Sequence, residues 1–257
     1  LGGKTPLEAA RMPYLQRIAA KSVAGMMYTI GKGIAPESDS AVFSLLGYDV
    51  KKEYTGRGPL EAYGAGINLK DNELALRANF ATVNAKREVV DRRAGRSVTE
   101  SEAKELKREI NSIKINGVKL LFKHTVGYRG VLVLSSSVFK LSASISNADI
   151  GYAKKGSMSI ALSKYSNKLP AVRPLNKDRA SAETAKLLNK VVEMIIDKLS
   201  KSRINEERER KGLPQANALL LRDAGLGLPK VESFSDRYGL SAAFITEMPV
   251  ERGIARL

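Results

Sequence analysis

Arginine side chains are the most prominent groups in this sequence that could bind an anion. Six of them lie within two residues of Gly, Asn or Asp in short segments: Arg57, Arg77, Arg92, Arg93, Arg96 and Arg129. A planar guanidinium group can hold a carboxylate or a phosphate through two hydrogen bonds at once. Any one of these arginines could instead be a solvated surface residue or part of a structural ion pair. Taken together, they indicate a site for carboxylate or phosphate oxygens.

A candidate nucleophile is Ser38. The run Ser38-Asp39-Ser40 precedes an apolar segment and predicts the N-terminus of a helix. A serine hydroxyl is a weak nucleophile that needs a metal or a base to activate it, whereas a helix N-terminus favours a phosphorylated, anionic product at the same place. The alternative is that Ser38 only caps the helix.

The composition limits the classes of protein to consider. The chain has 257 residues, a net charge of +16, one His and no Cys. This excludes a disulfide scaffold, a thiolate metal site, a Cys-nucleophile enzyme and a self-contained site that needs two histidines. The positive charge predicts an anionic partner, which could be nucleic acid, a membrane surface or a small phosphorylated metabolite. Because neither a long apolar run nor a signal-peptide pattern is present, we expect a cytoplasmic protein without a membrane span.

Two segments of the sequence are similar to nucleotide-binding motifs, but neither matches its motif in full. Five residues separate Gly25 from Gly31-Lys32 where a phosphate loop has four, and Gly33 stands where Ser or Thr should be. Gly64-Ala65-Gly66 lacks the third glycine of a dinucleotide fingerprint. Because only 6% of residues are aromatic, base-stacking side chains are scarce and nucleic acid is the weaker interpretation.

Helical and strand patterns alternate along the chain and predict an α/β fold. Capping boxes at Thr5 and Thr99 predict helix starts, the first helix burying Leu7. The other expected helices begin at Pro13, Ser38 and Ser181, and the expected strands are 118–122, 131–134, 218–221 and 240–245, the last two in a parallel sheet. We expect a loop or short strand at 25–33, a loop or lid at 135–170, and a solvated helix end at 203–211.

Several of these segments resemble the archaeal type of cofactor-independent phosphoglycerate mutase. They are Gly2–Ala10, Ser38-Asp39, Leu45–Asp49, Tyr54–Gly66 (YTGRGPLEAYGAG), Arg77–Thr82, Asp91–Arg96, Asn205, Arg208, Gly212, Ala216-Asn217 and Arg252–Ala255. The likeness spans most of the chain.

The resemblance implies an alkaline-phosphatase-like α/β core, here partial, with an inserted α/β domain. We expect core residues at 1–53 and 214–257 and the insertion at 54–213. The family interconverts 3-phosphoglycerate and 2-phosphoglycerate without bisphosphoglycerate. A serine held by two divalent metal ions (Mn, Mg, Co or Zn) takes the phosphoryl group and returns it to the other hydroxyl. Ser38 matches that serine, which makes it both the nucleophile and a metal ligand.

The resemblance also implies roles for the other polar residues. The six arginines become candidates for binding a small phosphorylated substrate. Asp91 is a second catalytic candidate, either orienting an arginine or handling hydroxyl protons, with an ion pair to its neighbours as the alternative. His124 lies in a segment similar to one near the family's substrate, although a lone His is more often a structural hydrogen-bonding group.

This sequence departs from the family pattern at three places. Glu37 stands where Gly is usual, Val42 where His is usual, and Asn147–Gly151 replaces a segment of the type Asp-Thr-Asp-Pro-His. The chain also begins at Leu1 and ends within an apolar segment, which indicates a fragment; alone, it should bind no metal pair tightly and turn over negligibly. The alternatives are a divergent, inactive relative that binds phosphorylated acids, or a basic nucleic-acid-binding protein.

Overall fold

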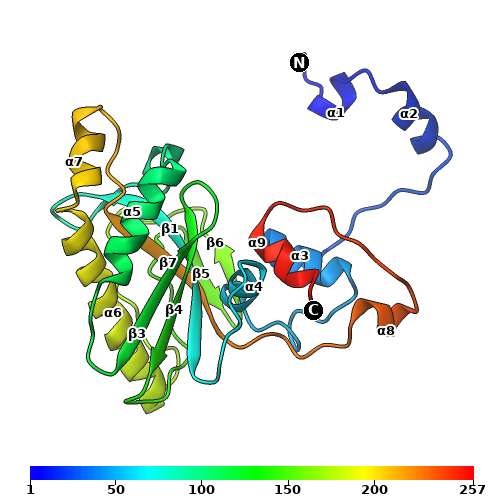
Figure 1. Ribbon diagram of the computed structural model, residues 1–257. Coiled ribbons are helices and arrows are strands. Elements are labelled where there is room, and N and C mark those ends of the chain that lie inside the picture. Colours follow the sequence, from blue (N-terminus) through cyan, green and yellow to red (C-terminus); the bar gives the residue numbers. More distant parts are fainter.

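An antiparallel sheet forms the centre of the computed structural model, which describes all 257 residues (Figure 1). Its strands are β1 (Glu73–Val83), β2 (Val89–Asp91), β3 (Val118–His124), β4 (Arg129–Ser136) and β7 (Ala218–Leu226). β1 pairs with β2, β4 and β7, and β3 adds to β4. Every one of these pairs is antiparallel. The strand expected at 218–221 is therefore confirmed, but its expected parallel pairing is wrong.

Side chains alternate between the two faces of β1, and the two faces differ in character. Leu74, Leu76, Ala78 and Phe80 point into the main core. On that side lie α5 (Glu100–Asn111) and α6 (Arg179–Leu199), whose apolar stripes include Leu106 and Leu188. On the opposite face, Ala75 packs with α4 (Arg57–Gly64) in a small apolar cluster. Polar side chains on that second face are thus held between the sheet and one short helix.

A second, smaller cluster of buried side chains lies beside the sheet. It joins α3 (Ser38–Leu45), α4 and α9 (Pro249–Ile254) through residues that include Phe43, Leu60 and Val250. Tyr48 extends it, and its hydroxyl donates to the Glu232 carbonyl oxygen just before α8 (Phe234–Tyr238). In Figure 1 this cluster stands next to the edge of the sheet domain, with α4 between them.

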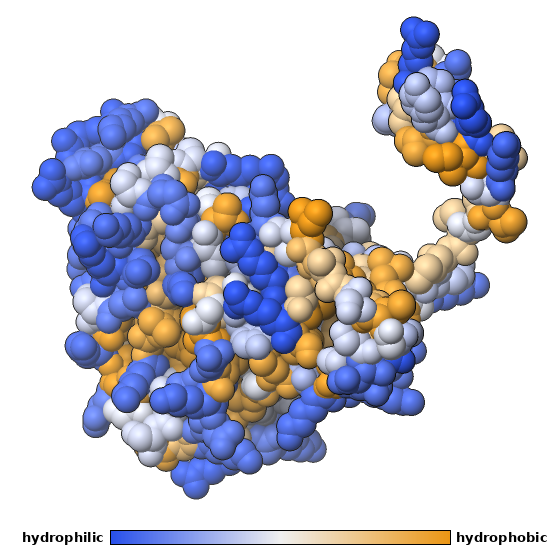
Figure 2. Space-filling model, turned by 45° about the vertical axis from the view of Figure 1, so that its right-hand side comes forward, coloured by the Kyte–Doolittle hydropathy of each residue, from blue (hydrophilic) through white to orange (hydrophobic).

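Residues 1–28 extend away from the rest of the molecule (Figure 2). Thr5 makes the expected capping box at α1 (Pro6–Ala9), and α2 (Pro13–Ala19) begins at Pro13 as expected. Neither helix has a buried residue, so the prediction that Leu7 packs inward is wrong. Residues 25–33 form a loop without a strand. None of the helices of this structure combines the length and the apolar character that crossing a membrane requires.

Several other expected elements are confirmed, and two are wrong. The capping box at Thr99 opens α5, and the longest helix is α6. The segment 135–170, expected to be a loop, contains a hairpin of β5 (Tyr152–Lys155) and β6 (Met158–Ala161). Residues 240–245, expected to be a strand, have no regular structure, and their apolar side chains are exposed because no neighbouring strand pairs with them.

The charged run at 203–211 forms a separate helix, α7 (Arg203–Arg210), and it is not simply a solvated end. Arg208 is fully buried. Its guanidinium group donates to Glu102 Oε2 at 2.8 Å, to Ser97 Oγ at 2.8 Å and to the Pro214 carbonyl oxygen at 2.9 Å. It thereby ties α7 to the start of α5 and to the turn of η1 (Ala94–Arg96).

Replacing Arg208 by lysine should lower the free energy of unfolding by about 2 kcal/mol, because an ammonium group cannot reach the three directions that the guanidinium fork serves. Urea titration followed by circular dichroism measures the change. Arg203→Lys on the same helix is the matched control, since the Arg203 side chain is 86% exposed. Equal stabilities of the two variants would contradict the role given to Arg208.

Candidate functional site

The polar face of the sheet carries two arginines directly opposite each other. Arg77 on β1 pairs in register with Arg222 on β7. Both are buried, with 5% and 4% of their surface exposed. Two buried cations side by side repel each other unless carboxylates or a bound anion lie between them.

A β-bulge in β7 sets the direction of the Arg222 side chain. The register with β1 shifts between Ala75 and Arg77, so that β7 contains one extra residue. Asp223 lies in this shift with a φ of 58°, in the left-handed region that a non-glycine residue rarely adopts. Bulges commonly redirect side chains beside functional sites, and this one brings Asp223 Oδ2 to 3.2 Å from Arg222 Nη1.

The third arginine comes from the first residue of α4. Arg57 can approach the sheet because Gly56 and Gly58 flank it. Gly56 has a φ of 113°, which favours glycine, and a Cβ on Gly58 would lie 2.2 Å from the Ala75 carbonyl oxygen. Helix α4 therefore rests directly on the backbone of β1, which places the Arg57 guanidinium group at the polar face.

Replacing Gly58 by alanine should displace the start of α4 and cost about 1–3 kcal/mol of folding free energy, because the clash is with backbone that has little room to move. Thermal or urea denaturation measures this loss. Gly25→Ala is the control, since nothing lies within 4 Å of a Cβ at that loop position. A Gly58→Ala variant as stable as the control would mean that α4 does not need this close approach.

Glu61 is the carboxylate that holds two of the arginines. It is fully buried on α4, with Oε2 2.9 Å from Arg57 Nε and 3.0 Å from Arg77 Nη1. Burial raises the pKa of Glu61, but Arg77 and Arg57 outweigh it and leave that pKa below its usual value. Burial is the main reason that the pKa of Arg77 is lowered. At neutral pH this is an ionised carboxylate shared by two cations.

Ser38 lies beside this group, at the first residue of α3. Glu37 is the N-cap residue and Ser38 Oγ caps nothing, so the alternative that Ser38 only caps the helix is wrong. Ser38 is exposed, and its Oγ accepts a hydrogen bond of 3.3 Å from Arg57 Nη1. The same Nη1 lies 3.4 Å from Asp39 Oδ1, and Asp39 in turn accepts from the Tyr54 hydroxyl. An accessible hydroxyl thus stands directly against a fixed guanidinium group.

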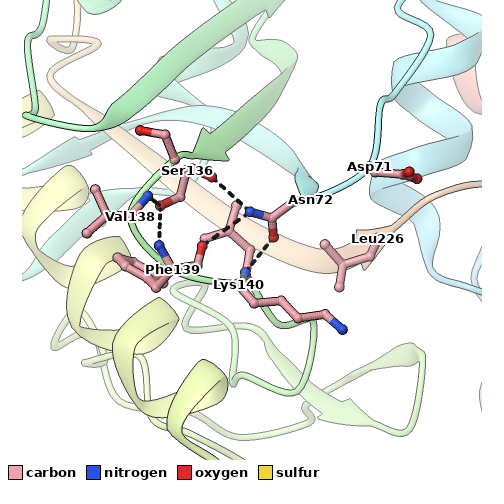
Figure 3. Close-up of a pocket in the computed structure, with 9 residues that line it drawn as sticks. Asp71, Asn72, Ser136, Val138, Phe139, Lys140 and Leu226 are labelled. Carbon is pink, nitrogen blue, oxygen red and sulfur yellow. Dashed lines mark hydrogen bonds between the residues drawn. The ribbon is translucent and has the colours of Figure 1, made fainter.

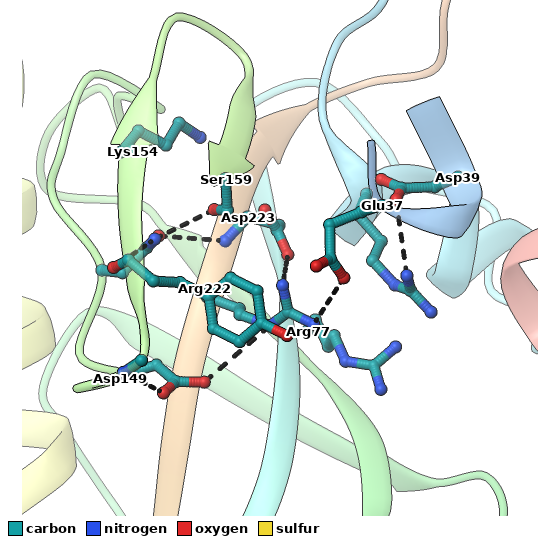
Figure 4. A network of polar contacts seen from close by, with 12 residues as sticks. Glu37, Asp39, Arg77, Asp149, Lys154, Ser159, Arg222 and Asp223 are labelled. Atoms are coloured by element: carbon teal, nitrogen blue, oxygen red, sulfur yellow. Dashed lines mark hydrogen bonds and ion pairs between the residues drawn. The ribbon is translucent and has the colours of Figure 1, made fainter. Parts of the chain in front are cut away.

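A fourth arginine joins through Asp149. Arg92 Nη2 donates to Asp149 Oδ1 at 2.8 Å, and Arg222 Nε faces Oδ2 of the same carboxylate at 3.8 Å. The Tyr152 ring lies under Arg222 Cζ at 3.7 Å and under Arg92 Cζ at 5.3 Å. Figure 4 shows Arg222 in the middle of these groups, with Asp149 on one side and Glu37 on the other.

Several of these buried polar atoms have no hydrogen-bond partner. They are Arg77 Nε, Arg92 Nε, Arg222 Nε and Nη1, Asp149 Oδ2 and Asp223 Oδ2. An unpaired buried donor costs about 1–3 kcal/mol, so such groups usually have a partner. All four of these donors belong to guanidinium groups, whose natural partners are carboxylate and phosphate oxygens. The two on Arg222 face Asp223 and Asp149 in ion pairs of 3.2 and 3.8 Å that lack hydrogen-bond geometry. The arrangement therefore suits a small anion with several oxygens.

Four of the residues proposed from the sequence lie apart from this group, and three of them, Asp91, Arg93 and Arg96, share one turn. Asp91 Oδ1 accepts from the Arg93 backbone N–H at 2.6 Å, which forms a local turn. Arg93 and Arg96 are exposed at this turn. Asp91 pairs in the sheet with Thr82, five positions along β1 from Arg77, which is roughly 16 Å at the usual rise per residue.

His124 and Arg129 lie at the β3–β4 hairpin. His124 Nε2 is 2.7 Å from the Gly127 carbonyl oxygen, and Nδ1 is 3.4 Å from Glu100 Oε2. Arg129 stacks on the Tyr128 ring at 4.6 Å and pairs in register with Asn79, on the same face as Arg77. Arg129 Nε is buried without a partner. The histidine thus has structural contacts, whereas Arg129 extends the cationic face along the sheet.

The residues present do not fit a pair of divalent metal ions. No group of three or more His, Cys, Asp or Glu side chains in this structure is arranged to hold a metal. The groups next to Ser38 are a guanidinium and Asp39, whose carboxylate already contacts Arg57 and Tyr54. One carboxylate and one hydroxyl are too few ligands for a two-metal centre.

Sequence reasoning missed Glu61, Arg222, Asp223 and Lys154. Lys154 Nζ donates to the Ala224 carbonyl oxygen at 2.7 Å, and burial lowers its pKa. A usable signal was present: Arg222-Asp223 interrupts an otherwise apolar run in β7. Charged residues inside a buried strand are rare unless they are paired or bind a ligand.

A separate pocket of about 580 Å³ lies at the other end of the sheet, around Asn72 (Figure 3). Asn72 Nδ2 donates to the carbonyl oxygens of Ser136 and Phe139, and its Oδ1 accepts from the Leu141 backbone N–H. The amide group is therefore fully used in holding the 136–141 loop. None of the side chains around this pocket has an unpaired buried polar atom. The polar groups of Asn72 serve to pack the 136–141 loop and are not left free to bind a ligand.

Comparisons with known proteins point to one family. A family model described as 2,3-bisphosphoglycerate-independent phosphoglycerate mutase matches residues 19–205. A relative of that name from Aeropyrum pernix is 45% identical over 255 residues, covering 97% of this chain and 60% of the relative. A second, from Methanocaldococcus jannaschii, is 41% identical and covers 99% of this chain and 58% of the relative. The chain thus spans about 60% of the length of the curated relatives it matches.

Two solved structures share the fold. A cofactor-independent phosphoglycerate mutase from Thermoplasma acidophilum matches with a TM-score of 0.58 and 33% identity, covering 100% of this chain and 62% of that one. A protein from Pyrococcus horikoshii matches with a TM-score of 0.66 and 26% identity, covering 99% of this chain and 54% of that one. The α/β fold of alkaline-phosphatase-like type expected from the sequence is confirmed.

Proposed function

Because this chain belongs to the family of 2,3-bisphosphoglycerate-independent phosphoglycerate mutases, we propose that it forms the phosphoryl-accepting and substrate-binding part of such an enzyme. The proposed reaction interconverts 3-phosphoglycerate and 2-phosphoglycerate, with Ser38 taking the phosphoryl group from one hydroxyl of glycerate and returning it to the other. The relatives' names describe enzymes that work without 2,3-bisphosphoglycerate, and we extend this to the present chain.

One observation carries the proposal: an exposed serine hydroxyl lies 3.3 Å from a fixed arginine, next to buried arginines with unpaired donors. A transferring phosphoryl group spreads negative charge over its oxygens, and positioned guanidinium groups stabilise that charge. Arg57 is placed to act on a phosphoryl group at Ser38. Arg77 and Arg222, opposite each other on the sheet, are placed to hold the remaining oxygens of a phosphorylated acid.

The roles of the remaining candidate residues are also proposals, and these residues differ in how close they lie to Ser38. Arg92 orients Asp149 beside Arg222, and Arg129 extends the same face. Four of the proposed residues lie apart from Ser38: Asp91, Arg93, Arg96 and His124. A role for them in binding or catalysis requires a substrate that moves along the sheet. The name of the family supports a small phosphorylated substrate, and we propose a cytoplasmic location as the place of such metabolites.

Metal ions and domain boundaries are proposals as well. Ser38 remains our candidate ligand for two divalent ions (Mn, Mg, Co or Zn), whose further ligands these residues do not supply. For the inserted domain, we keep 53/54 as the proposed first boundary. The pairing of β7 with β1 favours moving the second boundary from 213/214 to the end of β7 at Leu226.

The experiment is a calorimetric titration of the purified chain with 3-phosphoglycerate. We expect binding, and we expect Arg222→Lys to weaken it by about 10- to 100-fold, because a lysine keeps the charge but loses the two-pronged hydrogen bonding. Arg203→Lys on the surface is the control. An Arg222→Lys variant that binds as tightly as the control would remove Arg222 from the site, and nucleic acid bound in preference to 3-phosphoglycerate would favour the alternative function.

A further inference from the structure

Glu37 is a partly exposed acidic side chain beside the arginine group. It immediately precedes Ser38 and is the N-cap residue of α3, yet its side chain makes no capping hydrogen bond. Instead, Glu37 Oε2 lies 3.7 Å from Arg222 Nη2. In Figure 4 the Glu37 carboxylate points away from its own helix and toward the guanidinium group on β7. This contact joins the small cluster around α3 to the sheet.

The contact changes the charge of the site. The group contains five cationic side chains, Arg57, Arg77, Arg92, Lys154 and Arg222, and four carboxylates other than Glu37, namely Asp39, Glu61, Asp149 and Asp223. With Glu37 included, the two signs are equal in number. Without it, the group has an excess positive charge next to Ser38. Glu37 therefore lowers by one the positive charge that an arriving anion meets beside Ser38.

Glu37 also differs from the other four carboxylates in how firmly it is held. The side chains of Asp39, Glu61, Asp149 and Asp223 are at most 6% exposed, whereas that of Glu37 is 24% exposed. Its distance of 3.7 Å to Arg222 is longer than a direct hydrogen bond. A partly solvated carboxylate at this distance can leave the arginine at small cost, because water replaces the lost contact. Of the five, Glu37 is the one that can be displaced.

We propose that Glu37 sets the affinity threshold of this site: its carboxylate is a resident competitor at Arg222 that weak monoanions fail to displace and that phosphorylated acids do displace. The inference rests on the proposed function of this site. A simple carboxylate such as glycerate only exchanges one carboxylate on Arg222 for another and gains little. A phosphorylated acid brings further oxygens to Arg57 and Arg77, so its binding outweighs the loss of Glu37.

The test compares Glu37→Gln with the unaltered chain by calorimetric titration with 3-phosphoglycerate and, separately, with glycerate. Glutamine keeps the shape and removes the charge. We expect the affinity for both ligands to rise by about tenfold, because the substitution removes the carboxylate that each of them must displace from Arg222, and the binding of glycerate should then become measurable. Glu37→Asp, which withdraws the carboxylate from Arg222, should be intermediate. Glu247→Gln, an equal change of net charge at an exposed position, should bind as the unaltered chain does.

Each other result overturns the inference in a recognisable way. If Glu37→Gln and the unaltered chain bind both ligands equally, Glu37 does not compete at Arg222, while the proposed function stands. If Glu37→Gln binds 3-phosphoglycerate more weakly, Glu37 assists binding and the inference is reversed. If no variant binds either ligand at millimolar concentration, both the inference and the proposed substrate site fail. Unchanged circular dichroism spectra verify that the variants are folded.

Discussion

Replacing Glu61 by glutamine should lower the free energy of unfolding by about 3–5 kcal/mol, because it removes the single carboxylate shared by two buried arginines. The neutral amide still fits the space, but Arg57 and Arg77 then lie close together in the interior with only Asp39, on the Arg57 side, to compensate them. Urea denaturation at neutral pH, followed by circular dichroism, measures the loss. This loss of stability should exceed the losses expected for Gly58→Ala and for the surface substitution Arg203→Lys.

The pH dependence of stability gives a second test of the same residue. The folded-state pKa of Glu61 is lowered, so its contribution to stability is present above the unfolded value of about 4.5 and is lost as the pH falls through the folded-state pKa. The stability difference between the unaltered chain and Glu61→Gln should therefore shrink in acid. A difference that stays constant or grows below this range would contradict an ionised Glu61.

Glu105→Gln serves as the control for Glu61→Gln. Glu105 also pairs with an arginine, at 2.5 Å from Arg108, but both side chains are largely exposed, at 46% and 60%. Exposed ion pairs contribute little, so this variant should lose less than about 1 kcal/mol. Equal losses in the two variants would mean that Glu61 is no more important than a surface ion pair.

Replacing Ser38 by alanine should reduce phosphoryl transfer by roughly 10⁴-fold or more, because the neighbouring hydroxyls of Ser40 and Tyr54 are buried and already donate hydrogen bonds within the protein. The assay uses this chain fused to the part of the Aeropyrum pernix relative that it does not span, since the chain covers 60% of that protein. Conversion of 3-phosphoglycerate to 2-phosphoglycerate is followed directly, with manganese supplied in the buffer.

Stability separates a chemical role of Ser38 from a structural one. Ser38 is exposed and caps nothing, so Ser38→Ala should change the free energy of unfolding by less than about 0.5 kcal/mol. Ser235→Ala, at another exposed serine, should leave both stability and turnover unchanged. A Ser38→Ala fusion that retains near-normal turnover would exclude Ser38 as the phosphoryl acceptor.

Local sequence patterns were sufficient to predict most of the helices. Thr5 and Thr99 each form the predicted capping box, and the apolar spacing after Ser181 gives the longest helix. These signals are reliable because a helix start or an amphipathic stripe depends on residues three or four positions apart. The same local information indicated that Ser38 begins a helix and that arginines are the main anion-binding groups. The family likeness is carried by the same short segments.

Local sequence patterns did not predict which apolar side chains are buried. The apolar residues of α1, α2 and 240–245 have the spacing of buried elements, yet they are exposed, because burial depends on what packs against a segment. The direction of β7 is a further example, since an apolar run of strand length fits a parallel or an antiparallel neighbour equally well.

By itself, the sequence determined which residue types are available for chemistry: a serine at a helix start, many arginines and too few metal ligands. The tertiary structure alone decided which of them meet. Arg77 and Arg222 are far apart in the chain and face each other because β1 pairs with β7, and the bulge at Asp223 fixes the direction of the second one. Strand pairing is set by the free energy of the whole core, which no local pattern of residues encodes, and for that reason the arginines that form the site differ from the full set predicted.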